Sequence, residues 1–343
     1  MTPLKVLFTT AREARHQKTA LDTAPAGAHV EICVRPTPGE LARRLPDIDV
    51  LVTERLGAVH ADAINGAKRL KLIQRLGRMT QDIDLPAARA AGIPVCNWPL
   101  RNCAMVAEHM MMQILALAKR FRDCESTLLH PGEYDLPPRR CDANYFAINW
   151  TGRRDIKRLA DCTVGIMGFG EVGCELAVRL KPFGCKVLYH KRKPLPPEAE
   201  ELYGVDYADH ARIRADSDFL CLLLPHMADN GPPVGHDFLA GMKPGACLIS
   251  AGASSTLDEL AVAEAYRAGR LSGVATDGWS WEPTLPDNLL LRLAAGDATA
   301  NLALSPHTAG GSLTDDDILT NRRLEWSNVR NLMSGERLLN RIA

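Results

Sequence analysis

The chain has 343 residues, which corresponds to two domains of about 150 residues each. Hydrophobic residues make up 46% and aromatic residues only 5%, so aliphatic side chains must fill most of the core. The 41 Lys and Arg residues balance the 41 Asp and Glu residues, which gives a formal net charge of zero. This balance argues against a protein that binds nucleic acid or an anionic membrane through its overall charge.

Targeting and membrane signals are weak. The first apolar stretch, residues 4–8, is too short for a signal peptide, and no run is long enough for a membrane span. The ten cysteines form no CxxC pair and no Cys/His cluster with zinc spacing, so we expect no metal site. Reduced, buried thiols are then expected, and the sequence predicts a cytoplasmic protein.

Short aliphatic and β-branched runs alternate with helix-length segments along the chain. This alternation predicts parallel sheets with helices on both faces. A helix over 104–121 has apolar residues on more than one face and is expected to be buried, whereas 131–160 is irregular and leads into a second domain. The expected strands are 4–9, 29–34, 49–53, 71–75, 93–96, 162–168, 185–189, 218–224, 246–250, 273–277 and 302–305.

Residues 162–182 contain a glycine motif between a predicted strand and a predicted helix, Gly168-x-Gly170-x-x-Gly173. The first glycine permits a tight turn, the second lets backbone approach a pyrophosphate, and the third lets the helix pack on the strand. The amino end of the helix then offers N–H groups to the phosphates. The strand before and the helix after the motif favour a dinucleotide site over a glycine-rich turn without a ligand.

The end of the next strand indicates which dinucleotide binds. Sites for NAD usually place Asp or Glu there to hold the ribose hydroxyls. This chain has His190, Lys191, Arg192 and Lys193 instead, without a carboxylate. Adjacent cations suit a 2′-phosphate, so we expect NADP(H) in preference to NAD(H); the alternative is a solvated basic turn.

Taken in order, several segments give the chain a family resemblance. They are GIPVCNWPLRNCAMVAEH (92–109), GFGEVG (168–173), LLLP (222–225), MKPGACLIS (242–250), the segment 256–283 and LSPHTAGGS (304–312). With these motifs the chain resembles the D-isomer-specific 2-hydroxyacid dehydrogenase family over nearly its whole length.

The resemblance implies an α/β fold of two Rossmann-like or flavodoxin-like doubly wound parallel-sheet domains with an interdomain cleft. It implies a substrate domain over 1–102 and 313–343, and a dinucleotide-binding domain over 103–312. It also implies a homodimer, a small-molecule substrate, and hydride transfer between the nicotinamide and a 2-oxo or 2-hydroxy acid.

Members of this family use an Arg, a Glu and a His. His307 in SPHTAGG matches the family His, and Glu282 in WEP matches the family Glu. An imidazole can donate a proton to a carbonyl oxygen as hydride reaches the carbon, and a neighbouring carboxylate keeps it protonated. The resemblance therefore implies acid/base catalysis by His307 with help from Glu282.

The family Arg is absent, because counting back from Asp258 places Ala253 at its position. Alanine cannot bind a carboxylate or polarise a carbonyl. Three interpretations remain open: an engineered inactivating substitution, an enzyme that anchors its substrate differently, and a protein that binds cofactor without turnover. The second includes non-standard substrates such as phosphite.

The substrate loop also departs from the family pattern G-x-G-x-D-N-I-D. It reads Gly77-Arg78-Met79-Thr80-Gln81-Asp82, so Met79 replaces the second glycine and Arg78 stands beside it. Arg78 could supply a cation in place of the missing Arg, or it could point to solvent. Arg101 and Asn102 are weaker candidates for substrate contact.

The resemblance assigns further residues to the cofactor. Within the glycine motif they are Gly168, Phe169, Gly170, Glu171, Val172 and Gly173. Beyond the basic run they are Leu224, Pro225, Ala251, Gly252, Asp277, His307 and Gly310.

Overall fold

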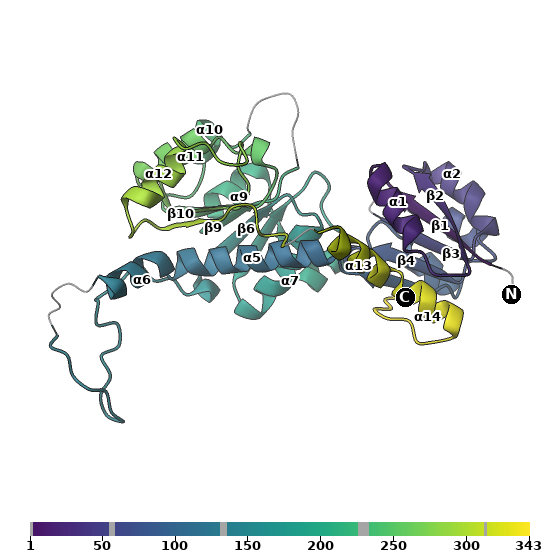
Figure 1. Ribbon diagram of the computed structural model, residues 1–343, viewed down its shortest axis with the longest axis horizontal. Coiled ribbons are helices and arrows are strands. Elements are labelled where there is room, and N and C mark those ends of the chain that lie inside the picture. The colour runs from purple at the N-terminus through teal and green to yellow at the C-terminus, as the bar shows by residue number, and fades with distance from the viewer. Residues whose placement is uncertain (1–2, 55–58, 131–135, 226–232, 312–313) are drawn as a thin grey trace. The chain divides into compact units, whose positions relative to one another are not determined.

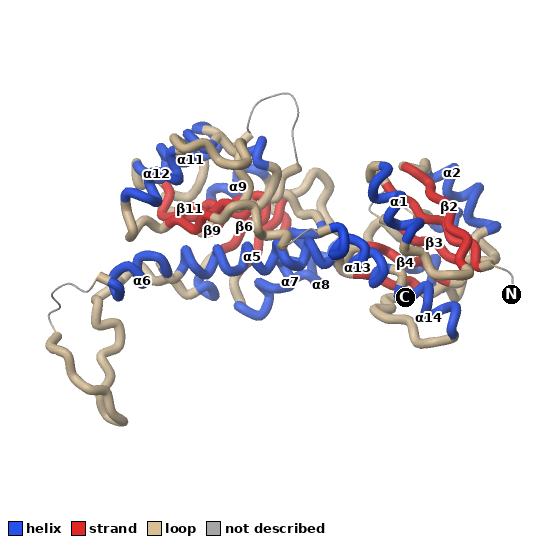
Figure 2. The backbone as a smooth tube through the Cα atoms, viewed as in Figure 1, coloured by secondary structure: helices blue, strands red, loops and turns tan. Residues whose placement is uncertain are grey.

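The computed structural model describes residues 3–54, 59–130, 136–225, 233–311 and 314–343. The chain divides into two compact units, one formed by Met1–Met105 with Gly310–Ala343 and the other by Val106–Ala309. Each unit is built on one parallel sheet, whose strands are red in Figure 2. The predicted domain boundary at 312/313 lies outside the described residues.

The first unit contains a five-stranded sheet with the order β2-β1-β3-β4-β5, and every neighbouring pair is parallel. Because β1 lies between β2 and β3, the chain winds in both directions from β1, as in doubly wound folds. The strands are β1 (Leu4–Thr10), β2 (Ala28–Val34), β3 (Val50–Thr53), β4 (Leu72–Leu76) and β5 (Val95–Trp98). The helices are α1 (Ala14–Asp22), α2 (Pro38–Arg44), α3 (Ala61–Gly66), α4 (Leu85–Ala90), α13 (Asp315–Glu325) and α14 (Ser327–Ser334), with a 3-10 turn η1 (Leu45–Asp47).

Successive side chains of these strands point to opposite faces of the sheet and so enter two cores. Leu7 and Ile73 belong to the core covered by α2, α3 and α4. Phe8 belongs to the core on the other face, with residues of α1 and α14. Trp326 of the C-terminal segment is buried there, with its ring centroid 5.6 Å from that of Phe8. The end of the chain therefore completes the core begun by its first strand.

The second unit contains a seven-stranded sheet with the order β12-β11-β10-β9-β6-β7-β8, again entirely parallel. The strands are β6 (Thr163–Met167), β7 (Lys186–His190), β8 (Asp206–Tyr207), β9 (Phe219–Leu222), β10 (Ala246–Ser250), β11 (Leu271–Thr276) and β12 (Leu302–Leu304). The helices are α5 (Arg101–Ala118), α6 (Phe121–Leu129), α7 (Glu171–Leu180), α8 (Pro197–Tyr203), α9 (His210–Asp216), α10 (His236–Ala240), α11 (Glu259–Arg267) and α12 (Leu289–Gly296), with 3-10 turns η2 (Leu159–Asp161), η3 (Lys181–Phe183) and η4 (Ser254–Thr256).

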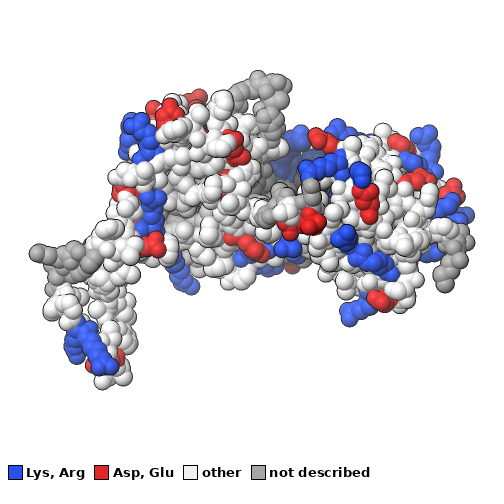
Figure 3. Space-filling model, viewed as in Figure 1, with Lys and Arg blue, Asp and Glu red and all other residues white. Residues whose placement is uncertain are grey.

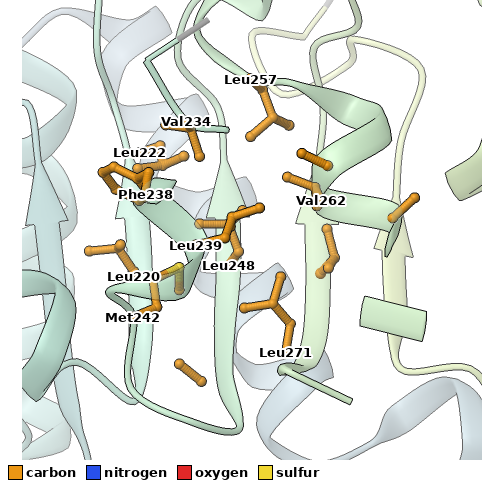
Figure 4. Close-up of a cluster of buried hydrophobic side chains, with 14 of the residues drawn as sticks. Leu220, Leu222, Val234, Phe238, Leu239, Met242, Leu248, Leu257, Val262 and Leu271 are labelled. Carbon is orange, nitrogen blue, oxygen red and sulfur yellow. The ribbon is translucent and has the colours of Figure 1, made fainter. Parts of the chain in front are cut away.

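Helices cover both faces of this second sheet. In Figure 1, α5 and α7 lie on one side of it, and α10, α11 and α12 lie on the other. Figure 4 shows the core on the latter side, where Leu220 and Leu248 of the sheet meet Phe238 of α10 and Val262 of α11. The prediction of two doubly wound parallel-sheet domains is confirmed, and every predicted strand is present to within two residues at either end.

The predictions differ from the structure in three local details. The sequence did not indicate β8, which has only two residues at the sheet edge. The predicted helix over 104–121 is α5, which begins and ends three residues earlier, because Arg120 has a left-handed φ of +51° between α5 and α6. Cys141 is exposed, and Cys103, Cys124 and Cys185 are half-buried, so the expectation of buried thiols holds only in part.

The described residues show neither a membrane-spanning helix nor a metal-binding cluster. None of the helices there is long and apolar enough to cross a lipid bilayer. The same residues contain no group of three His, Cys, Asp or Glu side chains arranged to hold a metal ion.

Candidate functional site

The glycine motif forms the connection between β6 and α7, as the sequence predicts. Gly168 has a φ of +95°, and a Cβ atom there would lie 2.4 Å from the carbonyl oxygen of Leu223, so only glycine fits. Gly170 is the N-cap of α7 and, as a glycine, has no side chain with which to cap that helix. The first N–H groups of α7 are therefore available to an anion, which fits the pyrophosphate of a dinucleotide.

Two side chains of the motif are occupied by packing. Phe169 is 2% exposed, and its ring centroid lies 4.8 Å from that of Tyr189. Glu171, in the first turn of α7, is also buried. We therefore restrict the predicted cofactor contact of Phe169 to its backbone.

The basic run begins at the carboxyl end of β7. The carbonyl of His190 accepts hydrogen bonds from the backbone N–H groups of Gly168 (3.0 Å) and Phe169 (3.3 Å), which fixes the start of the run beside the glycine motif. Lys191 is half-buried, and Arg192 and Lys193 are exposed. The cations thus follow the strand end at which a ribose-binding carboxylate stands in NAD sites.

The ends of β9 and β10 lie close together. The N–H of Ala251 donates to the carbonyl of Leu222 (3.2 Å), and that of Ala253 donates to the carbonyl of Leu224 (3.0 Å). A Cβ atom at Gly252 would lie 2.8 Å from the Leu224 oxygen, so the two backbones approach as closely as glycine allows. Pro225, predicted to border the nicotinamide, is exposed at the end of this segment.

His307 and Glu282 are in direct contact. His307 Nδ1 lies 2.7 Å from Glu282 Oε2, and the backbone N–H of Trp279 donates to Glu282 Oε1 at 3.0 Å. The hydrogen bond with the carboxylate raises the pKa of His307, and the same bond lowers the pKa of Glu282. With Nδ1 donating to Glu282, the exposed imidazole keeps Nε2 for a proton that can be transferred.

Asp277 holds the loop that carries His307. Its carboxylate accepts the N–H groups of Thr308 (2.9 Å) and Ala309 (2.8 Å) and the hydroxyl of Ser305 (2.6 Å). The Ser305 hydroxyl also lies 2.8 Å from His109 Nε2 of α5. His307 has a φ of +55°, an unusual conformation for a residue with a side chain. The hydrogen bonds of Asp277 therefore stabilise a strained backbone.

The family resemblance assigned Asp277 to the cofactor, whereas both oxygens of its carboxylate accept hydrogen bonds from the loop that carries His307. His109 also supports this loop, through its contact with Ser305. Trp279 also supports the loop, because it is buried and its indole N–H donates to the Ser305 carbonyl at 2.9 Å. Trp281, by contrast, is exposed.

Ala253 stands at the start of η4 with an ordinary backbone, φ −63° and ψ 130°. Its carbonyl accepts from the N–H (3.0 Å) and the hydroxyl (2.7 Å) of Thr256. The residue is half-buried. A longer side chain at this position therefore introduces no backbone strain.

The substrate loop of the first unit follows β4. The N–H of Gly77 donates to the carbonyl of Trp98 at 2.7 Å, and Asn97 Nδ2 donates to the carbonyl of Arg78 at 3.2 Å. The fully buried Arg75 donates from Nε to both carboxylate oxygens of Asp82, at 3.0 and 3.1 Å. These contacts fix both ends of the loop, which carries a half-buried Arg78.

The remaining predicted residues have simpler positions. Met79 is 2% exposed, so its side chain packs inside the protein. Arg101 and Asn102 are exposed in the first turn of α5. Gly310 groups with the first unit, directly after the His307 loop.

The sequence did not indicate the residues that support the substrate loop, namely Arg75 with Asp82, and Asn97. The sequence did contain a signal for Arg75. It lies within the short strand β4, and a buried arginine almost always has a charged partner, so a partner such as Asp82 could have been predicted.

Three known proteins resemble this chain. The D-3-phosphoglycerate dehydrogenase of Archaeoglobus fulgidus is 29% identical over 314 residues, which are 90% of this chain and 56% of that protein. The glyoxylate reductase of Thermococcus litoralis is 29% identical over 281 residues, 82% of this chain and 79% of that protein. A protein of solved structure from Pyrococcus horikoshii has a TM-score of 0.56 and 25% identity, with coverage of 100% of this chain and 95% of that one. This chain thus spans little more than half the length of the first relative.

The chain also matches the domain sequence of a known protein family. Residues 111–309, more than half of the chain, match the NAD binding domain of D-isomer specific 2-hydroxyacid dehydrogenases. The match includes the glycine motif, the basic run, Glu282 and His307. The chain therefore belongs to the D-isomer specific 2-hydroxyacid dehydrogenase family.

Proposed function

We propose that this protein is an NADP(H)-dependent oxidoreductase that transfers hydride between the nicotinamide and a 2-oxo or 2-hydroxy acid. The observation that carries the proposal is the 2.7 Å contact between His307 and Glu282 on the unit that bears the glycine motif. A protein that only bound cofactor would need no acid–base pair, so this contact favours an enzyme.

The cofactor assignment rests on the chemistry of two strand ends. After β6, Gly168 and the uncapped start of α7 suit a pyrophosphate. After β7, the run from His190 to Lys193 suits a 2′-phosphate, and a carboxylate for ribose hydroxyls is absent from it. When bound, the nicotinamide supplies or accepts the hydride.

His307 supplies the proton in this proposal. Its Nδ1–H donates to Glu282, which leaves Nε2 to protonate the carbonyl oxygen of a 2-oxo acid. The carboxylate favours the charged imidazolium, so the acid form persists above the ordinary His pKa. In the oxidative direction, neutral His307 accepts the proton of the hydroxyl group.

Substrate anchoring is where this chain departs from its family. Ala253 offers no cation, so we propose that Arg78 binds the substrate carboxylate. The loop that carries Arg78 is held by Asn97 and by the Arg75–Asp82 ion pair. The departure at Ala253 also favours a second candidate, a dehydrogenase for a non-standard substrate such as phosphite.

The test is oxidation of NADPH and NADH with a panel of 2-oxo acids, together with reduction of NADP⁺ by phosphite. Turnover of a 2-oxo acid with NADPH supports the proposal, and turnover of phosphite alone supports the second candidate. NADPH binding without turnover of any substrate would leave a cofactor-binding protein and overturn both.

Replacing Arg78 with Ala is expected to raise KM for the oxo acid by about 10- to 100-fold with a smaller change in kcat, because a charge-assisted contact to the carboxylate is lost. Steady-state kinetics at saturating NADPH measure the effect. Arg43→Ala is a matched control, since Arg43 is an exposed arginine on α2 of the same unit and lies outside the substrate loop. An unchanged KM in Arg78→Ala would exclude the anchoring role.

We also propose a homodimer. Residues 136–158 form a long loop, visible at the lower left of Figures 1 and 2. This loop and α6 expose large apolar side chains, which on a soluble surface mark an interface. They are Phe121, Leu128, Leu129, Leu136, Phe146, Ile148, Trp150 and Ile156. On the face shown in Figure 3, charges of both signs are interspersed over the chain, this loop included.

Replacing Ile148, which is 81% exposed, with Glu is expected to convert the dimer to monomers, because a charge would be buried at the interface. Light scattering after size-exclusion chromatography measures the mass. Leu202→Glu on α8 is the control, an exposed apolar residue outside the loop. A dimer that persists in Ile148→Glu places the interface elsewhere.

A further inference from the structure

A second histidine lies beside the start of the basic run. The ring centroid of His210 is 4.2 Å from that of His190, and the planes meet edge to face at 67°. The two residues are brought together because β8 pairs with β7 and then leads directly into α9, which begins at His210. His210 is exposed, whereas His190 is half-buried.

His190 is held rigidly between the glycine motif and β8. Its carbonyl accepts the N–H groups of Gly168 and Phe169, and its Nδ1 lies 2.9 Å from the carbonyl of Ala208. Since a carbonyl only accepts, we assign the proton to Nδ1, which leaves Nε2 as the second polar atom of the ring. The fixed ring of His190 in turn sets the position of the His210 ring against it.

The charges around His210 are mainly positive. His190 and Arg214 of the same helix are the positively charged or ionisable groups that act on it, and Lys191 to Lys193 directly follow His190 in the sequence. Asp209 is the carboxylate closest in sequence, but it accepts the N–H groups of Ala211 (3.0 Å) and Arg212 (2.8 Å) as the N-cap of α9. Burial, His190 and Arg214 together lower the pKa of His210, with a weaker opposing effect of Asp209. A bound phosphate dianion would instead stabilise the protonated imidazole and raise the pKa of His210.

We propose that His210, set in place by His190, is a specificity-determining residue that binds the 2′-phosphate of NADP(H) together with the basic run. This role rests on the proposed function, since it requires the dinucleotide at the glycine motif. It adds to that function one further phosphate-binding group, from a different element, and a dependence of cofactor choice on pH.

The pH dependence follows from linkage. A 2′-phosphate with about two negative charges at neutral pH favours the protonated ring, so NADPH binding takes up a proton where the free ring is neutral. NADH lacks this phosphate and takes up no proton at His210. The ratio of the two affinities removes contributions common to both cofactors, including that of His307.

The experiment measures dissociation constants of NADPH and NADH by calorimetry from about pH 6 to pH 8, where histidines change charge. The proteins are the parent chain, His210→Gln, and His236→Gln as a control for an exposed histidine of the same unit. In His210→Gln we expect the preference for NADPH to fall about tenfold at the acid end, the contribution of one charge-assisted contact. Binding of NADH stays unchanged, and the proton uptake on binding NADPH decreases.

The outcomes separate this inference from the function on which it rests. A His210→Gln protein with the parent's preference at every pH overturns the role of His210 and leaves the proposed function intact. A parent chain that binds NADH as tightly as NADPH overturns the proposed cofactor preference, and with it this role. Because the readout is binding, neither outcome depends on finding the substrate.

Discussion

Substituting His307 with Gln is expected to lower kcat for reduction of a 2-oxo acid by about 10²- to 10⁴-fold, the contribution of a positioned general acid. Gln can still donate a hydrogen bond to the carbonyl oxygen but has no proton to transfer at neutral pH. The NADPH dissociation constant should change far less, because the glycine motif and the basic run stay intact. Single-turnover kinetics and a binding titration measure the two quantities separately.

The pH profile supplies a second readout of the same pair. The bond to Glu282 raises the pKa of His307, so the protonated acid is present below that raised pKa and is lost as pH rises through it. Reduction is therefore flat at acid pH and declines on the alkaline side. In Glu282→Gln the stabilising charge is absent, and the decline moves to lower pH.

A matched control is the pair formed by His236 and Glu264, whose atoms lie 3.8 Å apart on the surface of the same unit. His236→Gln should leave both kcat and the profile unchanged. A profile that keeps its shape in Glu282→Gln would contradict the assignment of Glu282 as the partner that sets the pKa of His307.

The fold was predictable because its signals are local. Each strand is a short aliphatic run between turn residues, and buried parallel strands need no alternation to be recognised. The glycine motif was equally clear, since Gly168 must adopt a φ that other residues rarely do. The strand that the sequence did not indicate, β8, has only two residues, which are too few to show a periodic pattern.

In the candidate site, the sequence indicated His307 and Glu282 as a pair but did not indicate the residues that support them. His307 and Glu282 follow from the family resemblance, and their 2.7 Å contact agrees with the paired roles. Asp277 holds the His307 loop partly through Ser305, whose hydroxyl also contacts His109, 196 residues earlier in the chain. Contacts over such separations are set by the packing of α5 against the sheet, for which one sequence contains no pattern.

The proximity of His210 to His190 is a contact of the same kind. The edge strand β8 that brings them together is the one strand that the sequence did not reveal. The prediction of the 2′-phosphate site therefore included the basic run, which is contiguous, and omitted His210.

Substituting Ala253 with Arg is the second large effect that we expect, an increase in kcat/KM for 2-oxo acids of about 10²- to 10³-fold, as when one preorganised donor to a developing oxyanion is restored. The backbone at Ala253 has ordinary angles, and its N–H and carbonyl are already bonded to Leu224 and Thr256. The larger side chain therefore does not require the loop to refold. Ser254→Arg, which adds the same charge one residue further along, is the control.

The result also separates the open interpretations of Ala253. A gain confined to Ala253→Arg identifies a family member disabled at one position, whether by engineering or by descent. Efficient turnover by the parent chain, with no gain in Ala253→Arg, identifies an enzyme whose substrate is anchored elsewhere, and the Arg78→Ala variant then has its full effect. Combining Arg78→Ala with Ala253→Arg is decisive between these, because two cations that serve the same carboxylate give changes that are not additive.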